Sequence, residues 1–179
     1  MALDPQEVRR ARDYLDKTET GVRDAVLGMS DAQWKFKPAP GRWCAAEIVE
    51  HLAIVAAGAE QQLNKMADAP AAPSGRDTKA IDAHILKAVP DRSARLQAPD
   101  AILPTGRWTP RESQEELFAH CRHLRSRLES ADHLREHVVP NVFLGPLDGY
   151  QWILLVAAHN ARHTKQILEL KSDPNFPAA

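Results

Sequence analysis

An all-α fold, a four-helix bundle, is what this sequence predicts. Apolar residues recur at helical spacing in four long segments, about 5–29, 44–67, 110–137 and 148–170. The period-two alternation of a half-buried strand is nearly absent. One connection, residues 68–109, is much longer than the other two. Amphipathic helices with one long crossover are typical of a four-helix bundle, here a single domain over residues 1–179.

The composition agrees with one globular domain. The chain has 179 residues, of which 44% are hydrophobic and 26% charged, enough for a sizeable core. A net charge of -1 gives no whole-chain attraction for nucleic acid or an anionic membrane, so we expect neither as a partner. No apolar run reaches the roughly 18 residues of a membrane span. Because the start "MALDPQEVRR" has no signal-peptide core, we expect a cytoplasmic protein.

The first helix begins with a clear capping pattern. Asp4, Pro5 and Glu7 are a cap, a first-turn proline and a capping-box acid. The connector "DAQWKFKPAPGRW" then excludes a continuous helix through its prolines and glycine. We expect its aromatic residues to plug one end of the core rather than bind a ligand. They are Trp34, Phe36 and Trp43.

The remaining helices are separated by the crossover and by a break. The second helix begins around Cys44, and in the crossover only a segment near 78–89 looks capable of a short helix. Thr109, Pro110 and Glu112 repeat the capping pattern and open the third helix. The stretch "VVPNVFLGP" ends it, and the fourth helix follows with a cap of its own.

Connection lengths predict the topology. The first and third connections are short enough to join antiparallel neighbours, whereas the crossover can return the chain to the same end. The predicted order is therefore up-down-down-up, with the second and fourth helices antiparallel. In that order His51, early in the second helix, and His163, late in the fourth, lie at one level of the bundle.

Helical phase separates the histidines. His159 and His163 both fall at the centre of the apolar stripe of the fourth helix. His133 and His137 have the same spacing but lie opposite the apolar stripe of the third helix, so we expect them in solvent. We expect surface or rim positions for the others, which are His84, His120 and His123.

Three inward imidazoles at one level indicate a metal site. A buried imidazole is costly unless it is hydrogen-bonded or coordinated, and His51, His159 and His163 suit a divalent transition metal. Zinc or nickel comes first, with iron, manganese, copper or cobalt as alternatives. Hydrogen-bonded core histidines or a haem between His51 and His159 are the other interpretations. The Glu-x-x-His pairs of a di-iron site are absent.

Two segments of the chain resemble motifs of a known family. "GRWCAAEIVEHL" resembles the W-S-x-x-E-x-x-x-H-L segment, and "HNARHTKQI" the H-x-x-R-H-x-x-Q-I segment, of the DinB-like (YfiT-like) metalloenzymes. The resemblance implies an up-down-down-up bundle with a divalent metal on three histidines, which map onto His51, His159 and His163. Members include S-transferases and isomerases that use mycothiol or bacillithiol, and others described as hydrolases.

The motifs contain further candidate residues. Glu47 is a capping-box acid, a general base or a second-shell partner of an imidazole. Gln166 points inward and can orient a ligand, whereas we expect Arg162 in a surface ion pair and Asn160 in solvent. Cys44 stands where the family often has the serine that caps the helix, which puts that cap in doubt.

The two cysteines, Cys44 and Cys121, are too few for a disulfide framework and do not form a CxxC pair, so we expect free thiols. A thiol at a helix N-terminus can have a lowered pKa, which makes Cys44 an alternative nucleophile.

The leading functional interpretation is a metal-dependent enzyme acting on a small molecule. Its metal would activate water, as in a hydrolase, or a low-molecular-weight thiol, as in an S-transferase. The alternative is a non-catalytic bundle in which a structural metal supports a homodimer or a partner-binding module. A haem-binding or other small-molecule-binding module is a third interpretation.

Overall fold

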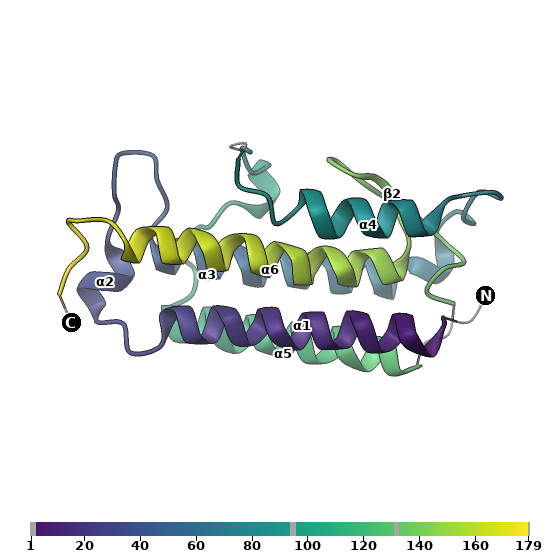
Figure 1. Ribbon diagram of the computed structural model, residues 1–179, viewed down its shortest axis with the longest axis horizontal. Coiled ribbons are helices and arrows are strands. Elements are labelled where there is room, and N and C mark those ends of the chain that lie inside the picture. Colours follow the sequence, from purple (N-terminus) through teal and green to yellow (C-terminus); the bar gives the residue numbers. More distant parts are fainter. Residues whose placement is uncertain (1–2, 94–95, 131–132, 179) are drawn as a thin grey trace.

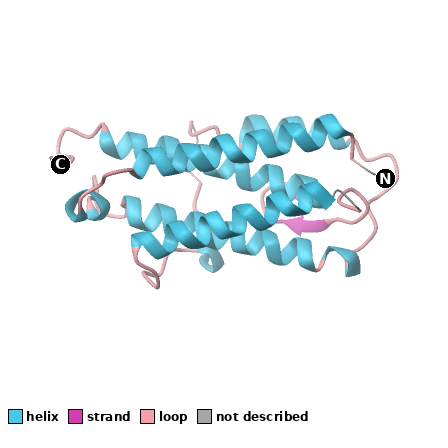
Figure 2. Ribbon diagram, turned by 90° about the horizontal axis from the view of Figure 1, so that it is seen from below, coloured by secondary structure: helices cyan, strands magenta, loops and turns pink. Residues whose placement is uncertain are grey.

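The computed structural model describes residues 3–93, 96–130 and 133–178. Four long helices lie side by side as a bundle (Figures 1 and 2). They are α1 (Pro5–Val26), α3 (Ala45–Asn64), α5 (Pro110–Ser130) and α6 (Gly149–Lys171). The shorter elements are α2 (Asp31–Lys35), η1 (Met66–Asp68), α4 (Thr78–Ala88), η2 (Asp100–Ile102), β1 (Val139–Asn141) and β2 (Gly145–Leu147).

The predicted topology is confirmed. Around the bundle, α1 packs against α6, α6 against α3, α3 against α5, and α5 against α1. In Figure 1, α1 and α6 run in one direction while α3 and α5 run in the other, which is the up-down-down-up order. The helix that carries His51 is therefore antiparallel to the helix that carries His159 and His163.

Local capping explains where two of the long helices begin. The Asp4 carboxylate accepts a hydrogen bond from the Gln6 backbone N–H, while the Glu7 carboxylate accepts one from the Asp4 N–H. Asp148 and Gln151 form the corresponding reciprocal pair at the start of α6. Each capping box satisfies N–H groups that the first helical turn leaves unpaired.

The third predicted helix is too long, since α5 ends at Ser130 rather than at residue 137. His133 has a φ of 63°, a left-handed conformation that an α-helix cannot contain. Ala131, predicted on the apolar stripe of this helix, lies outside the described residues. The segment predicted as a simple break forms the antiparallel hairpin β1–β2. Strands of three residues are too short to show period-two alternation, so the pattern could not indicate them.

The crossover covers α6 more completely than a plain bundle would. Its helix α4 lies along the outside of α6 (Figure 1) and buries Ile85. Asn160 and Arg162 were both predicted to face solvent, yet they are 1% and 8% exposed. Asn160 Nδ2 lies 3.9 Å from Cys121 Sγ on α5, and the Arg162 guanidinium donates to the Val89 and Asp91 carbonyls after α4. Both predictions are wrong because packing on several sides leaves α6 little solvent-facing surface.

The core between the long helices is built mainly from aliphatic side chains. Fully buried examples are Leu15, Leu52, Leu117, Leu124 and Ile153, with at least one from each of the four helices. Burial of this continuous apolar face is what stabilises helices of this length in a bundle. Among the described residues, no helix combines the length and the apolar character needed to cross a membrane.

Candidate metal centre

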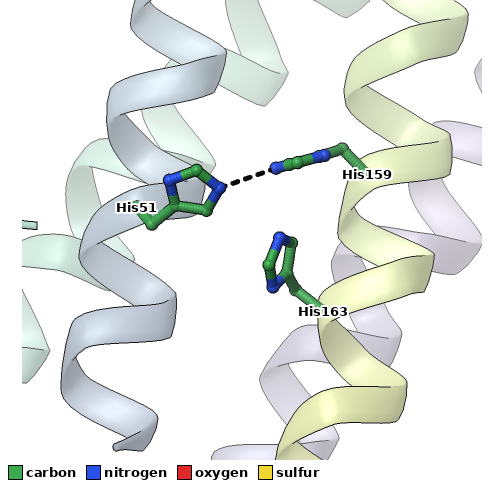
Figure 3. Close-up of side chains that lie close together, drawn as sticks. All are labelled: His51, His159 and His163. Carbon is green, nitrogen blue, oxygen red and sulfur yellow. Dashed lines mark hydrogen bonds between the residues drawn. The ribbon is translucent and has the colours of Figure 1, made fainter. Parts of the chain in front are cut away.

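Three imidazoles from two antiparallel helices converge inside the bundle (Figure 3). His51 comes from α3, and His159 and His163 come from successive turns of α6. One ring nitrogen of each lies within 4.8 Å of the corresponding nitrogens of the other two. The ring centroids are 4.5 to 5.0 Å apart. The structure thus brings together the three histidines predicted from helical phase and level, in a cluster that could hold a metal ion.

His51 has a defined orientation and tautomer. Its Nδ1 lies 2.7 Å from the Ile102 carbonyl oxygen in η2. Because a carbonyl oxygen only accepts, Nδ1 carries the proton, and Nε2 of the neutral ring carries a lone pair. This Nε2 points at His159 Nε2, 2.9 Å away (Figure 3).

The grouping of the rings favours a single ion over the haem interpretation. His51 Nε2 and His159 Nε2 share a hydrogen bond, and the third ring lies beside them. Three rings grouped around one point instead fit a single ion.

His163 is oriented from the other side of the site. Its Nδ1 lies 2.8 Å from Gln166 Oε1. The Arg92 guanidinium also donates to this oxygen, at 3.3 Å, and so holds the carboxamide with its oxygen toward the ring. His163 Nδ1 is therefore the donor, and its Nε2 is free to act as a ligand. Gln166 thus contacts His163, and its predicted role in orienting a metal ligand stays a prediction.

The environment favours neutral rings. Burial lowers the pKa of His159 and of His163 well below its ordinary value, and the neighbouring imidazoles lower it further. Burial also lowers the pKa of His51, against the opposing effect of its bond to Ile102. Metal coordination requires deprotonated imidazole, so the three rings are in the form that a metal needs. An all-nitrogen donor set fits zinc, nickel or copper better than magnesium or calcium.

Trp43 forms a wall of the site, which the sequence interpretation missed. Its ring centroid lies 4.8 Å from that of His51 and 6.4 Å from that of His163, onto which it stacks. Trp43 had been expected only to plug the core. The indole gives two of the rings an apolar neighbour and limits their movement. Trp34 and Phe36 do pack at the α2 end of the bundle, as predicted.

Glu47 is used as a helix cap. Its carboxylate accepts hydrogen bonds from the Cys44 N–H at 2.8 Å and from Lys37 Nζ at 2.7 Å. The cap is therefore kept although cysteine replaces the family's serine. Burial alone would raise the pKa of Glu47, but these bonds lower it below the ordinary value. The geometry favours the capping interpretation over a general base, because both oxygens are engaged and the low pKa makes a weak base.

The two thiols lie in environments that disfavour the thiolate. Cys44 and Cys121 are both free and buried. Burial raises the pKa of the Cys44 thiol, which argues against the alternative of an activated nucleophile. Burial also raises the pKa of Cys121, to about 12.

Glu50, which sequence reasoning did not single out, positions the crossover over the site. Its buried carboxylate accepts hydrogen bonds from the three consecutive backbone N–H groups of residues 105–107. These bonds lower the pKa of Glu50 although burial opposes the shift. The anchored loop follows η2, whose Ile102 carbonyl binds His51. Local pattern could not indicate this role, since the partner is a loop more than fifty residues away.

The three histidines differ in exposure, since His51 and His163 are buried and His159 is partly exposed. A surface hollow of about 440 Å³ is lined by Gln166, the residue that contacts His163, but not by the three histidines themselves. Its other lining residues include Arg42 and Glu169. A hollow of this size is in the range of small-molecule sites.

The other histidines lie apart from this cluster. His84 and His133 are exposed, as predicted. His137 is half-buried and its Nδ1 bonds the Ala69 carbonyl at 2.7 Å, so its predicted solvent position is wrong. The helical phase used for His137 did not apply, because α5 ends before it. His120 and His123 flank a glutamate on another face of α3.

Comparisons with known proteins agree with this site and fold. A model of the DinB superfamily matches residues 14–167. The uncharacterized protein YuaE of Bacillus subtilis (strain 168) is 28% identical over 155 residues, with 82% of this chain and 88% of that protein covered. No solved structure gives a significant match. The family match spans most of the chain, and this protein belongs to the DinB superfamily.

Proposed function

We propose that the protein is a metal-dependent enzyme whose divalent metal is held by His51, His159 and His163. One observation carries the proposal: three neutral imidazoles converge, and one of them remains partly exposed. A site built only to hold the fold together would be closed around its ion by four protein ligands. Among the described residues, this group supplies three.

A bound divalent metal would supply Lewis-acid chemistry, lowering the pKa of a water for hydrolysis or of a thiol for S-transfer. The chain's own residues would do the rest. The Ile102 carbonyl and Gln166 keep two rings in the ligating tautomer. Trp43 shields two of the rings, while His159 is the one ring of the three that is partly exposed.

The size of the surface hollow lined by Gln166 indicates the substrate class. The hollow that shares Gln166 with the site can take a small molecule. A low-molecular-weight thiol is the co-substrate in the transfer reaction. A reducing cytoplasm suits both this thiol and the two free cysteines. A homodimer stays a prediction.

The test is metal analysis of untagged protein, followed by screens for hydrolysis and thiol transfer. After dialysis against metal-free buffer, we expect about one tightly bound divalent metal per chain. We expect turnover that chelation removes and that metal addition restores. Failure to retain metal after reconstitution with zinc, nickel, iron and manganese would overturn the proposal.

A further inference from the structure

A second group of metal-binding side chains lies where α3 packs against α5. It consists of Glu60 on α3 with His120 and His123 on α5, and one ligand atom of each lies within 4.8 Å of the others. Glu60 follows His51 by nine residues, which places it on the opposite side of α3 and roughly 14 Å further along the helix. The group is therefore separate from the three-histidine centre.

The Glu60 carboxylate contacts both imidazole rings of this group. Glu60 Oε2 lies 2.6 Å from His120 Nδ1. His123 Nδ1 lies 3.1 Å from Glu60 Oε1 and 3.2 Å from Oε2. The two histidines are one turn apart on α5, so both rings leave the same face of that helix. The Nδ1 atoms of both imidazoles on α5 thus face one anionic group on α3.

The outer nitrogen of His120 also faces a carboxylate. His120 Nε2 lies 3.7 Å from Glu116 Oε2, one turn earlier on α5. Metal-ligating histidines characteristically direct their second ring nitrogen to a carboxylate, which orients the ring and raises its basicity as a ligand. The pair Glu116–His120 places such a carboxylate on the side of the ring away from Glu60.

We propose that Glu60, His120 and His123 form a second site for a divalent transition metal, with zinc as the best fit. Two imidazole nitrogens and one carboxylate oxygen are a donor set that zinc accepts. The ion would replace the protons through which the rings now bond to Glu60, so binding releases protons. The side chains of Glu60 and His120 are about one-fifth exposed and that of His123 is 61% exposed, which leaves a path from solvent.

Two consequences follow from the position of this site. A metal there joins α3 to α5, so it stabilises the folded state by binding to that state alone. Its exposed donors stay in contact with water, so the ion is held less tightly than at the three-histidine centre. The second site should fill at saturating zinc and empty on dialysis, whereas the first centre retains its metal.

The test is equilibrium dialysis of untagged, metal-free protein against saturating zinc. We expect about two zinc ions per chain in the wild type, and about one in the variant that combines His120→Ala with His123→Ala. We expect about one zinc ion per chain in His159→Ala, bound at the second site. Zinc should therefore raise the melting temperature of this variant. His133→Ala is the matched control, since His133 also bonds a carboxylate, that of Glu136, but lies outside the cluster.

A second variant tests the outer carboxylate. In the His159→Ala background, Glu116→Gln should weaken zinc binding about tenfold. Circular dichroism would establish that the variants fold. We expect them to fold, because the substituted side chains of the second site are partly exposed. One zinc per chain in the wild type at saturation would overturn the second site. Two zinc ions in the His120→Ala, His123→Ala variant would overturn it as well, and neither result bears on the three-histidine centre.

Discussion

Helix α6 carries buried polar groups at its start and from its midpoint onward, here called its paired end and its histidine end, and the two are built on opposite principles. Near its start, the fully buried Asp148 carboxylate accepts hydrogen bonds from Arg76 at 2.9 Å and from Arg135 at 3.0 Å. Further along the helix, His159 and His163 face His51, and the rings of these three residues bond to one another, to a backbone carbonyl and to a carboxamide. The first end pairs charges, and the second collects neutral imidazoles.

Arg135 shows what the paired end does. Besides Asp148, it binds the Asp82 carboxylate on α4 at 2.6 Å and the Glu7 carboxylate on α1 at 2.9 Å. One guanidinium therefore connects three helices. Buried charges with partners of this kind hold a geometry, whereas converging neutral imidazoles are suited to bind a cation. The comparison indicates a structural role for one end of α6, and the proposed function rests on the other.

The largest expected effect is loss of metal from the histidine end. His159→Ala removes one of three ligands, and the dialysed protein should retain little or no metal, because three ligands leave no redundancy. Elemental analysis measures this. Replacing both His133 and His137 by alanine should leave the retained metal unchanged. Equal losses in the two variants would show that the ligand assignment is wrong.

A substitution at the paired end should change the stability of the fold rather than the metal content. Arg135→Met leaves Asp82 and Asp148 without a shared buried cation, and it should lower the free energy of unfolding by about 3–5 kcal/mol. Urea unfolding of the metal-free protein measures the loss. The folded fraction should retain metal as the wild type does. A variant with unchanged stability but lost metal would reverse the roles assigned to the two ends.

A smaller effect is expected from the residue that orients His163. Gln166→Leu removes the acceptor of the His163 Nδ1 proton and should weaken metal affinity 10–100-fold, about 1.4–2.7 kcal/mol. Competition with a chelator of known affinity gives the constant. Glu47→Gln is the control, because Glu47 contacts Lys37 and Cys44 rather than a ligand. If Glu47→Gln weakens binding as much, Glu47 has a role in the centre that its contacts do not indicate.

The smallest expected effect is on the pH dependence of the free energy of unfolding, to which His163 should contribute. In the metal-free protein the folded-state pKa of His163 lies well below the unfolded value near 6.5. Its contribution is complete above about pH 6.5 and is lost as the pH falls toward the folded pKa, by up to about 1.4 kcal/mol per pH unit. Urea unfolding between about pH 7.5 and pH 5.5 should show a shallower decline in His163→Gln. Identical slopes would mean that the ring is not held neutral.

The helical pattern was sufficient to predict most of the bundle and which three histidines converge. The four apolar stripes and the length of the crossover determine the topology, and the topology puts His51 level with His163. The i, i+4 spacing of His159 and His163 places both on the stripe facing α3. These inferences need only helix geometry, which is uniform along a chain.

What failed depends on contacts between distant segments. Arg162 was misplaced because the chain after α4 covers a face of α6 that a plain bundle leaves open. Asn160 was misplaced because it faces Cys121 on α5, inside the bundle. The Ile102 carbonyl and the Glu50 anchor involve loop backbone, which no periodicity reveals. Trp43 was assigned to the core by its type, although its ring lies against two of the clustered histidines.

The most direct test of the central claim is the response of the cobalt-substituted protein to added ligands, with one equivalent of cobalt bound. An open centre should bind a small thiol as the thiolate near neutral pH and produce a sulfur-to-cobalt charge-transfer band. His51→Ala should abolish or shift the band, and Cys44→Ala should leave it in place. If neither thiols nor azide change the spectrum, the centre is closed, the metal is structural, and the enzyme proposal is contradicted.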